Sequence, residues 1–212
     1  SDGGRCNVSH ACFDPKELVQ FYPRGNKELL SIFHKFQPGD TMEWFEQRNA
    51  SLKIENDNRM FPESNSSQTI INTLLEEVAN KNLQIHTKSV VLEIEPKENQ
   101  YLITTTTNSY LADFVVYTTG SSPKSLKMIQ SLGHKIVEPV PSLFTFNIKN
   151  ETVKDLMGTS FPNAEVAIPH LKMDESGPML ITHWGLSGPA ILKLSAWKAR
   201  ELADLKYQFE II

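Results

Sequence analysis

The chain has 212 residues, of which 40% are hydrophobic and 22% charged, a composition typical of a soluble globular protein with one large core or two small ones. Its formal net charge of -4 argues against a broad basic surface for nucleic-acid phosphates. The sequence contains no apolar run of membrane-spanning length and no secretory signal pattern, so we expect a cytoplasmic protein without a membrane partner.

The chain begins with the glycine-rich sequence SDGGRCN. Gly3 and Gly4 permit positive φ and close backbone approach, while Arg5 and Asn7 add a guanidinium and an amide. From these residues alone the segment is either a mobile tail or a turn whose N–H groups face an anion or a carbonyl.

Two cysteines, Cys6 and Cys12, flank His10. A disulfide is one interpretation, but so few cysteines fit a reducing compartment better. The three side chains fall short of the four ligands that a structural zinc site normally has, so no metal is expected.

Three helices are predicted next along the chain. Asp14 followed by a proline indicates a short helix that ends near Phe21. Asn26 caps a second helix with apolar residues at helical spacing, which Pro38-Gly39 ends. A third helix starts at Asp40 or the next residue, and its aromatic side chains are interpreted as core.

Alternating residues between Ala50 and Pro62 predict two short strands around a turn at 56–58. Ser66 or Ser67 begins the best helix of the chain. Its apolar stripe, which should be buried on one face, consists of Ile70, Ile71, Leu74, Leu75 and Val78. The segment Leu83–Thr87 then has the pattern of a parallel strand.

Residues 90–96 and 101–107 predict a hairpin, and the wholly apolar segment Asp113–Gly120 predicts a central strand of a sheet covered on both faces. A strand, a helix, an antiparallel excursion and a return strand follow the order of a nucleotide-binding domain. We therefore predict an α/β fold, with part of a Rossmann-like parallel sheet and a β-meander.

The pattern changes after Pro139 and Pro141 to short apolar strands at 143–149, 165–169, 178–184 and 207–212. A single helix is predicted from Pro189 to about Asp204. The domain boundary is accordingly expected at Pro139–Ser142, with an α/β domain over 1–140 and the start of a β-rich domain over 141–212.

Five stretches together carry a resemblance to a known family: Ser1–Asn7, Arg59–Asn65, Asp113–Ser121, Ser131–Leu143 and Thr182–Ser195. In this order and at these spacings the chain resembles the HI0933-like family of bacterial FAD-binding flavoproteins, also called BaiN-like or aminoacetone-oxidase-like. The resemblance covers the middle of such proteins. It implies that the G-x-G-x-x-G turn for the FAD pyrophosphate and the segment that closes over the flavin lie outside these 212 residues.

The resemblance also implies the cofactor-binding residues, which are Gly3, Gly4, Arg5, Cys6, Asn7, Val91, Thr118, Thr119 and Gly120. Asp2 and Ser121 stand where the family has glycines, and Arg59 and Pro62 match a family motif. From the residues alone, Thr118–Gly120 is either a ligand corner or an ordinary strand-to-loop turn.

His183 is the candidate for proton transfer, with a structural histidine at a strand end as the alternative, because no carboxylate partner can be assigned from sequence. We expect a fragment of an FAD-dependent oxidoreductase that acts with a small-molecule substrate, a nicotinamide donor or an RNA base. The alternative is a cofactor-free scaffold or interaction domain. The 212 residues themselves are expected to bind FAD weakly or not at all and to associate through exposed strand edges. Substrate and oligomeric state are left open.

Overall fold

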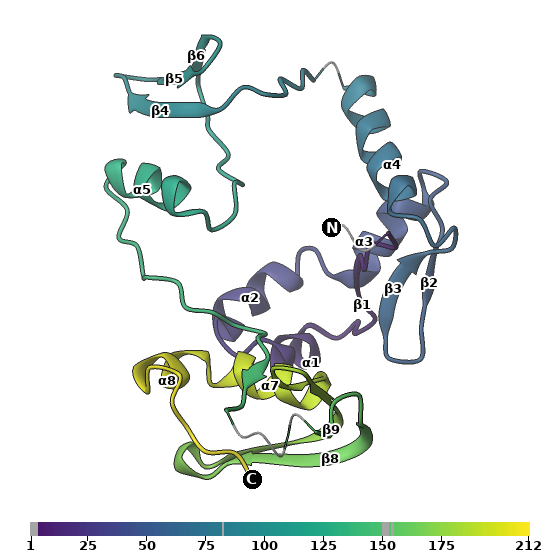
Figure 1. The fold of residues 1–212 in the computed structure, drawn as a ribbon. Helices are drawn as coiled ribbons and strands as arrows, with labels where there is room; N and C mark the ends of the chain where they lie inside the picture. Colours follow the sequence, from purple (N-terminus) through teal and green to yellow (C-terminus); the bar gives the residue numbers. More distant parts are fainter. Residues whose placement is uncertain (1–3, 82, 150–152, 154) are drawn as a thin grey trace. The chain divides into compact units, whose positions relative to one another are not determined.

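The computed structural model describes residues 4–81, 83–149, 153 and 155–212, which form two compact units that meet in sequence at Lys88 and Ser89 (Figure 1). The predicted α/β class is confirmed. All strand pairs in the described residues are antiparallel and form three small sheets. The boundary expected at Pro139–Ser142 stays a prediction. Each helix in the described part of the chain is too short or too polar to span a bilayer.

Three helices open the first unit: α1 (Pro15–Leu18), which continues as the 3₁₀ turn η1 (Val19–Phe21), α2 (Asn26–Phe33) and α3 (Pro38–Glu46). The predicted start of α3 was wrong, because Pro38-Gly39 forms its first turn instead of ending α2. Gln37 Oε1 accepts from Gly39 N (2.9 Å) and Asp40 accepts from Gln37 N (2.7 Å). This capping box satisfies the first N–H groups of the helix.

The sheet of the first unit has the order β1-β3-β2, with β1 at Ser9–His10, β2 at Leu52–Ile54 and β3 at Arg59–Pro62. The predicted hairpin around residues 56–58 is confirmed as β2 and β3. The central strand β3 is flanked on both sides, and its residues Met60 and Pro62 are fully buried. A core of Phe45, Ala50, Leu52 and Ile70 supports it.

Helix α4 (Ser67–Asn80) begins as predicted, with Ser66 Oγ accepting from Gln68 N (3.2 Å). The prediction that its whole apolar stripe is buried was wrong: Ile70 is buried, but Ile71, Leu74 and Leu75 are about half exposed. The three-stranded sheet is too small to cover more than the start of the helix. The strand predicted at Leu83–Thr87 is also wrong, since these residues pair with no described strand.

The second unit begins with the meander β4-β5-β6, formed by Val91–Pro96, Tyr101–Thr105 and Ser109–Ala112. The predicted hairpin is confirmed in β4 and β5. The central strand predicted at Asp113–Gly120 is wrong: this segment is not paired, and Phe114 and Val116 are 88% and 85% exposed. A parallel strand forms only beside neighbours, which the described sheets do not supply. Helix α5 (Pro123–Ser131) follows.

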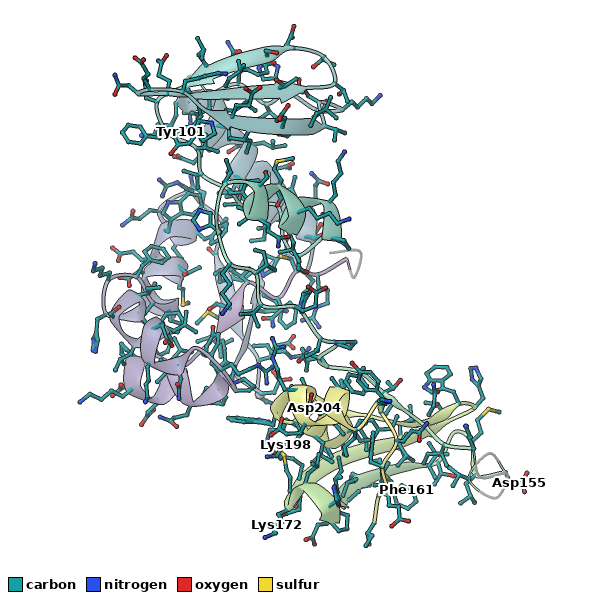
Figure 2. The ribbon with its side chains drawn as sticks, turned by 90° about the vertical axis from the view of Figure 1, so that its left-hand side faces the viewer. Tyr101, Asp155, Phe161, Lys172, Lys198 and Asp204 are labelled. Carbon is teal, nitrogen blue, oxygen red and sulfur yellow. The ribbon has the colours of Figure 1, made fainter. Side chains whose placement is uncertain are left out.

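The remaining sheet has the order β7-β10-β9-β8, with β7 at Phe146–Asn147, β8 at Ser160–Ile168, β9 at Met173–Thr182 and β10 at Gly185–Ser187. The 3₁₀ turn η2 (Pro169–Leu171) joins β8 to β9. The single helix predicted after Pro189 is two, α7 (Pro189–Trp197) and α8 (Ala199–Asp204), which are separated at Lys198 (Figure 2). Both helices contribute fully buried residues to the core, including Ile191, Leu194 and Leu202.

Candidate functional site

The opening loop lies against the central strand β3 through two arginines and one aromatic ring. The Arg5 guanidinium is 4.0 Å from the Phe61 ring centroid and forms an ion pair with Glu55. The Arg59 guanidinium lies 5.2 Å from the same ring centroid and 3.7 Å from the other Glu55 oxygen. We call Arg5, Glu55, Arg59 and Phe61 the arginine cluster. It joins two of the stretches that carried the family resemblance.

Backbone hydrogen bonds fix the loop in place. Gly4 O accepts from Ser67 N at the start of α4 (2.7 Å), and Val8 N donates to Met60 O (2.8 Å). Gly4 and Cys6 both have positive φ, 74° and 61°. In the amide orientation that satisfies both of its atoms, Asn7 donates to the carbonyls of Ser9 and Met60. The loop is therefore an ordered turn held by hydrogen bonds to β3 and α4. Gly3 lies outside the described residues.

Two features of the loop suit a polar ligand. A Cβ at Gly4 would meet no atom of the described residues within 4 Å, so these residues leave the backbone open on that side. The Nε–H of Arg5 is buried and has no hydrogen-bond acceptor among the described residues. Buried donors normally have partners, so this N–H would need an acceptor that the described residues do not supply.

An acidic rim adjoins the arginine cluster. Glu55, Asn56 and Asp57 line a hollow of about 390 Å³. Arg59 Nε donates to Asp57 Oδ2 (2.7 Å). Desolvation opposes ionisation of Asp57, but the hydrogen bonds from the Arg59 backbone and guanidinium outweigh it and lower the pKa of this carboxyl. Asp57 is therefore charged at neutral pH and balances Arg59, as Glu55 balances Arg5.

The other predicted cofactor residues belong to the second unit. Val91 is the first residue of β4 and is half-buried. Thr118, Thr119 and Gly120 are exposed in the segment after β6, and Gly120 has a φ of 72°. The structure describes each unit by itself, so a shared cradle formed by the opening loop and Thr118–Gly120 stays a prediction.

His183 occupies the two-residue turn between β9 and β10. It is exposed, and its ring packs edge-on against Trp184 at 4.3 Å. No ion pair joins it to a carboxylate in the described part of the chain. The turn is closed by Thr182 Oγ1, which donates to Gly185 O (3.0 Å). This geometry favours a structural histidine, and a role in proton transfer stays a prediction.

Comparison with known proteins places these features in a family. The model of the HI0933-like protein Rossmann domain matches residues 1–195. The chain belongs to the HI0933-like family. It is 24% identical to the ribosomal RNA dihydrouridine synthase of Escherichia coli K12, over 97% of this chain and 53% of that protein. It is also 24% identical to the 3-dehydro-bile acid delta(4,6)-reductase of Clostridium scindens, over 96% of this chain and 51% of the reductase. The chain thus spans about half the length of these relatives.

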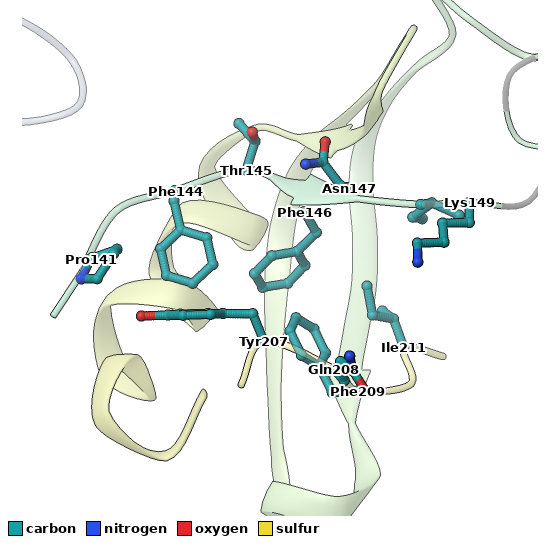
Figure 3. A pocket seen from close by; sticks show the side chains of 11 residues that line it. Pro141, Phe144, Thr145, Phe146, Asn147, Lys149, Tyr207, Gln208, Phe209 and Ile211 are labelled. Atoms are coloured by element: carbon teal, nitrogen blue, oxygen red, sulfur yellow. The ribbon is translucent and has the colours of Figure 1, made fainter. Parts of the chain in front are cut away.

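Sequence reasoning missed a pocket of this HI0933-like chain that lies in the second unit beside β7 (Figure 3). Its volume is about 810 Å³. Phe144 and Phe146 line it on one side and Tyr207 and Phe209 on the other. Alternating apolar residues in both segments were recognised as strand patterns, but nothing in the sequence indicated that the two segments face each other.

The cysteines of the chain are both free thiols. In the described residues no group of three His, Cys, Asp or Glu side chains could hold a metal ion. Desolvation raises the pKa of the Cys12 thiol, with smaller contributions of both signs from Asp14 and from Glu17. A raised pKa leaves less thiolate at a given pH, so Cys12 is a poor nucleophile near neutrality.

Cys12 is accordingly expected to react with iodoacetamide more slowly at pH 7 than a cysteine in an unstructured peptide, and to accelerate as the pH rises above 9. A Cys6→Ser variant isolates this thiol, and intact mass over time gives the rate. The urea-unfolded variant is the control, because unfolding restores the ordinary pKa. Equal rates for the folded and unfolded variant at pH 7 would contradict the prediction.

Proposed function

We propose that this chain is part of an FAD-dependent oxidoreductase that exchanges hydride or electrons with a small-molecule substrate or a nicotinamide donor. Membership of the HI0933-like family supports this, as does the resemblance to its flavoproteins. One relative is a reductase, and the other makes a dihydro base, so both names describe reductive chemistry. The formal net charge of -4 favours a small molecule over RNA as the substrate.

The observation that carries the proposal is the ordered loop Gly4–Asn7. Among the described residues, Gly4 has open space beside it and the Arg5 Nε–H has no acceptor. In the proposed site this loop holds FAD together with Val91 and Thr118–Gly120. Bound FAD supplies the hydride or electron transfer. The chain's own contribution is positional: Glu55 and Phe61 hold the Arg5 guanidinium. Its Nε–H, which has no acceptor among the described residues, would donate to a cofactor oxygen or nitrogen.

The test uses the full-length gene product. We expect it to purify with the visible absorbance of oxidised flavin, and Arg5→Ala to lower its flavin content at least about fivefold by loss of a charge-assisted hydrogen bond. Arg24→Ala, outside the loop, is the matched control and should retain flavin. A colourless full-length protein that takes up no FAD would refute the proposal and favour a scaffold.

The 212-residue chain alone should respond differently, since its sequence contains no G-x-G-x-x-G turn for the pyrophosphate. We expect added FAD at micromolar concentration to leave its melting temperature unchanged. A rise would show that the residues described here suffice for binding.

A further inference from the structure

The segment Glu138–Leu143, which we call the strap, leads into β7 and is held at both ends by helices α7 and α8. The Arg200 guanidinium on α8 donates to Glu138 O (2.9 Å). At the other end, Ser195 Oγ on α7 accepts from Phe144 N (2.9 Å). Between these two anchors, the strap takes part in none of the backbone hydrogen bonds of the described residues.

The anchor at the downstream end belongs to a rigid frame. Ser195 is fully buried, and its hydroxyl also donates to a carbonyl of α7 (2.8 Å). Trp184 Nε1 donates to Thr145 Oγ1 (3.2 Å), and Ile148 N donates to Trp184 O (2.9 Å). The stretch Thr182–Ser195, which carried part of the family resemblance, therefore fixes the residues that follow the strap.

Two prolines leave the strap little freedom to turn. Pro139 and Pro141 have φ fixed near about −65°, and each disfavours the helical region for the residue before it. The first four residues of the strap therefore favour an extended backbone. The turn toward β7 falls on the last two residues, and Leu143 forms a bend there with a φ of 58°.

The backbone of Leu143 is strained. At positive φ the Cβ of an L-residue comes too close to a carbonyl oxygen, and only glycine and short polar residues adopt this region routinely. The side chain of Leu143 is 66% exposed, so its burial does not offset the strain. Such strain persists only where the surrounding contacts impose it. Here these contacts are the two anchors, and breaking either one frees Leu143 to leave the left-handed region.

We propose that the strap is a strained conformational device, in which opening of the Ser195 anchor relieves the strain at Leu143. When both anchors are closed, the strap lies on α7 and α8 and limits the motion of the sheet β7-β10-β9-β8, the C-terminal sheet, relative to α5. When the Ser195 anchor is open, the strap is a flexible connection between them. Few-residue hinges of this kind serve domain closure in other proteins. The proposal goes beyond the oxidoreductase function and does not depend on it.

The first test measures how strongly the Phe144 amide is protected from hydrogen exchange in the full-length gene product, because this N–H is released when the Ser195 anchor opens. Leu143→Gly should raise the protection factor about two- to fivefold, since glycine adopts positive φ without strain and this gain exceeds its entropy cost. Leu143→Ala is the matched control, because it removes the same exposed side chain and keeps a strained residue. If the glycine variant is no better protected than the alanine variant, the proposal is wrong.

Arg200→Ala tests the coupling between the two anchors. It releases Glu138, so that Leu143 relaxes while the Ser195 anchor stays closed. Protection of the Phe144 amide should therefore rise by about the same factor, and Arg200→Ala should add nothing in the Leu143→Gly variant. Asp204→Ala on the same helix is the control. A strap held cooperatively without strain would instead lose protection in Arg200→Ala, and that result would overturn the proposal.

Ser195→Ala checks that the Phe144 amide reports on the anchor. Loss of the accepting hydroxyl should lower the protection factor at least about fivefold. Amides of β8 in the same sample are the internal reference and should keep their protection. An equal loss in β8 would mean that Ser195 supports the whole core and is not a separable anchor, which contradicts the proposal.

Discussion

Gly185→Ala is expected to lower the free energy of unfolding of the C-terminal sheet by about 3 kcal/mol or more. Gly185 has a φ of 147°, and a Cβ there would lie 2.1 Å from Phe146 O and 2.7 Å from Ile148 N. These are backbone atoms of β7 and of the residue that follows it, and β7 pairs with β10, which begins at Gly185. They can yield only if the β7–β10 ladder opens.

Gly158→Ala separates this steric effect from backbone strain. Gly158 also has a positive φ, 89°, but a Cβ there meets no atom of the described residues within 4 Å. Gly158→Ala should lower the free energy of unfolding only by the strain of an alanine with positive φ, about 1–2 kcal/mol. Urea unfolding followed by fluorescence, with hydrogen exchange of residues 144–149 and 185–187, measures both variants. Similar losses for the two would mean that contact with β7 does not decide the choice of glycine.

Gly185 lies in the Thr182–Ser195 stretch, which the sequence analysis selected only through the family resemblance. Its close contact with Phe146 could not be predicted from the sequence. Local signals were reliable elsewhere. Ser66 caps α4, and the turn at 56–58 joins two strands, because these features depend on hydrogen bonds between residues a few positions apart. The error at Pro38 was also local: proline was taken as the end of α2, although it is equally suited to the first turn of α3.

Predictions that required distant partners failed. The apolar segments Leu83–Thr87 and Asp113–Gly120 have the composition of buried strands, but a strand exists only where another supplies its hydrogen bonds. Likewise the stripe on α4 was identified correctly as apolar, yet its burial depends on how much surface the neighbouring sheet offers. Periodicity identifies the face of an element and does not indicate what covers it.

In the candidate site, too, the sequence identified individual segments but not the contacts between distant residues. The opening loop and the Arg59–Pro62 motif were each selected through the family resemblance. That Arg5 and Arg59 share one ring and one carboxylate follows only from the pairing of β1 with β3 across about 50 residues. Neither Glu55 nor Phe61 was predicted as part of the site, because neither a strand phenylalanine nor a lone glutamate stands out in a sequence.

Phe61→Ala is therefore the substitution expected to damage the candidate site most. Phe61 is 5% exposed in the central strand of the first unit, and removing such a ring costs about 3–5 kcal/mol. The guanidinium groups of Arg5 and Arg59 lose the surface on which they rest. We expect lower stability of the first unit and faster amide exchange in residues 4–8, measured by urea unfolding and hydrogen exchange.

Phe61→Leu divides this loss into its two causes. Leucine keeps most of the apolar burial and removes the π face, so the expected cost is about 1–1.5 kcal/mol, in line with a volume-conserving swap plus partly exposed cation–π contacts. Ile54→Ala on the neighbouring β2 is the control. Ile54 is 45% exposed, and the substitution leaves the Phe61 ring that Arg5 and Arg59 contact. If residues 4–8 exchange as slowly in Phe61→Ala as in Ile54→Ala, the ring does not hold the opening loop, and the backbone bonds of Gly4 and Val8 must be what fixes it to β3 and α4.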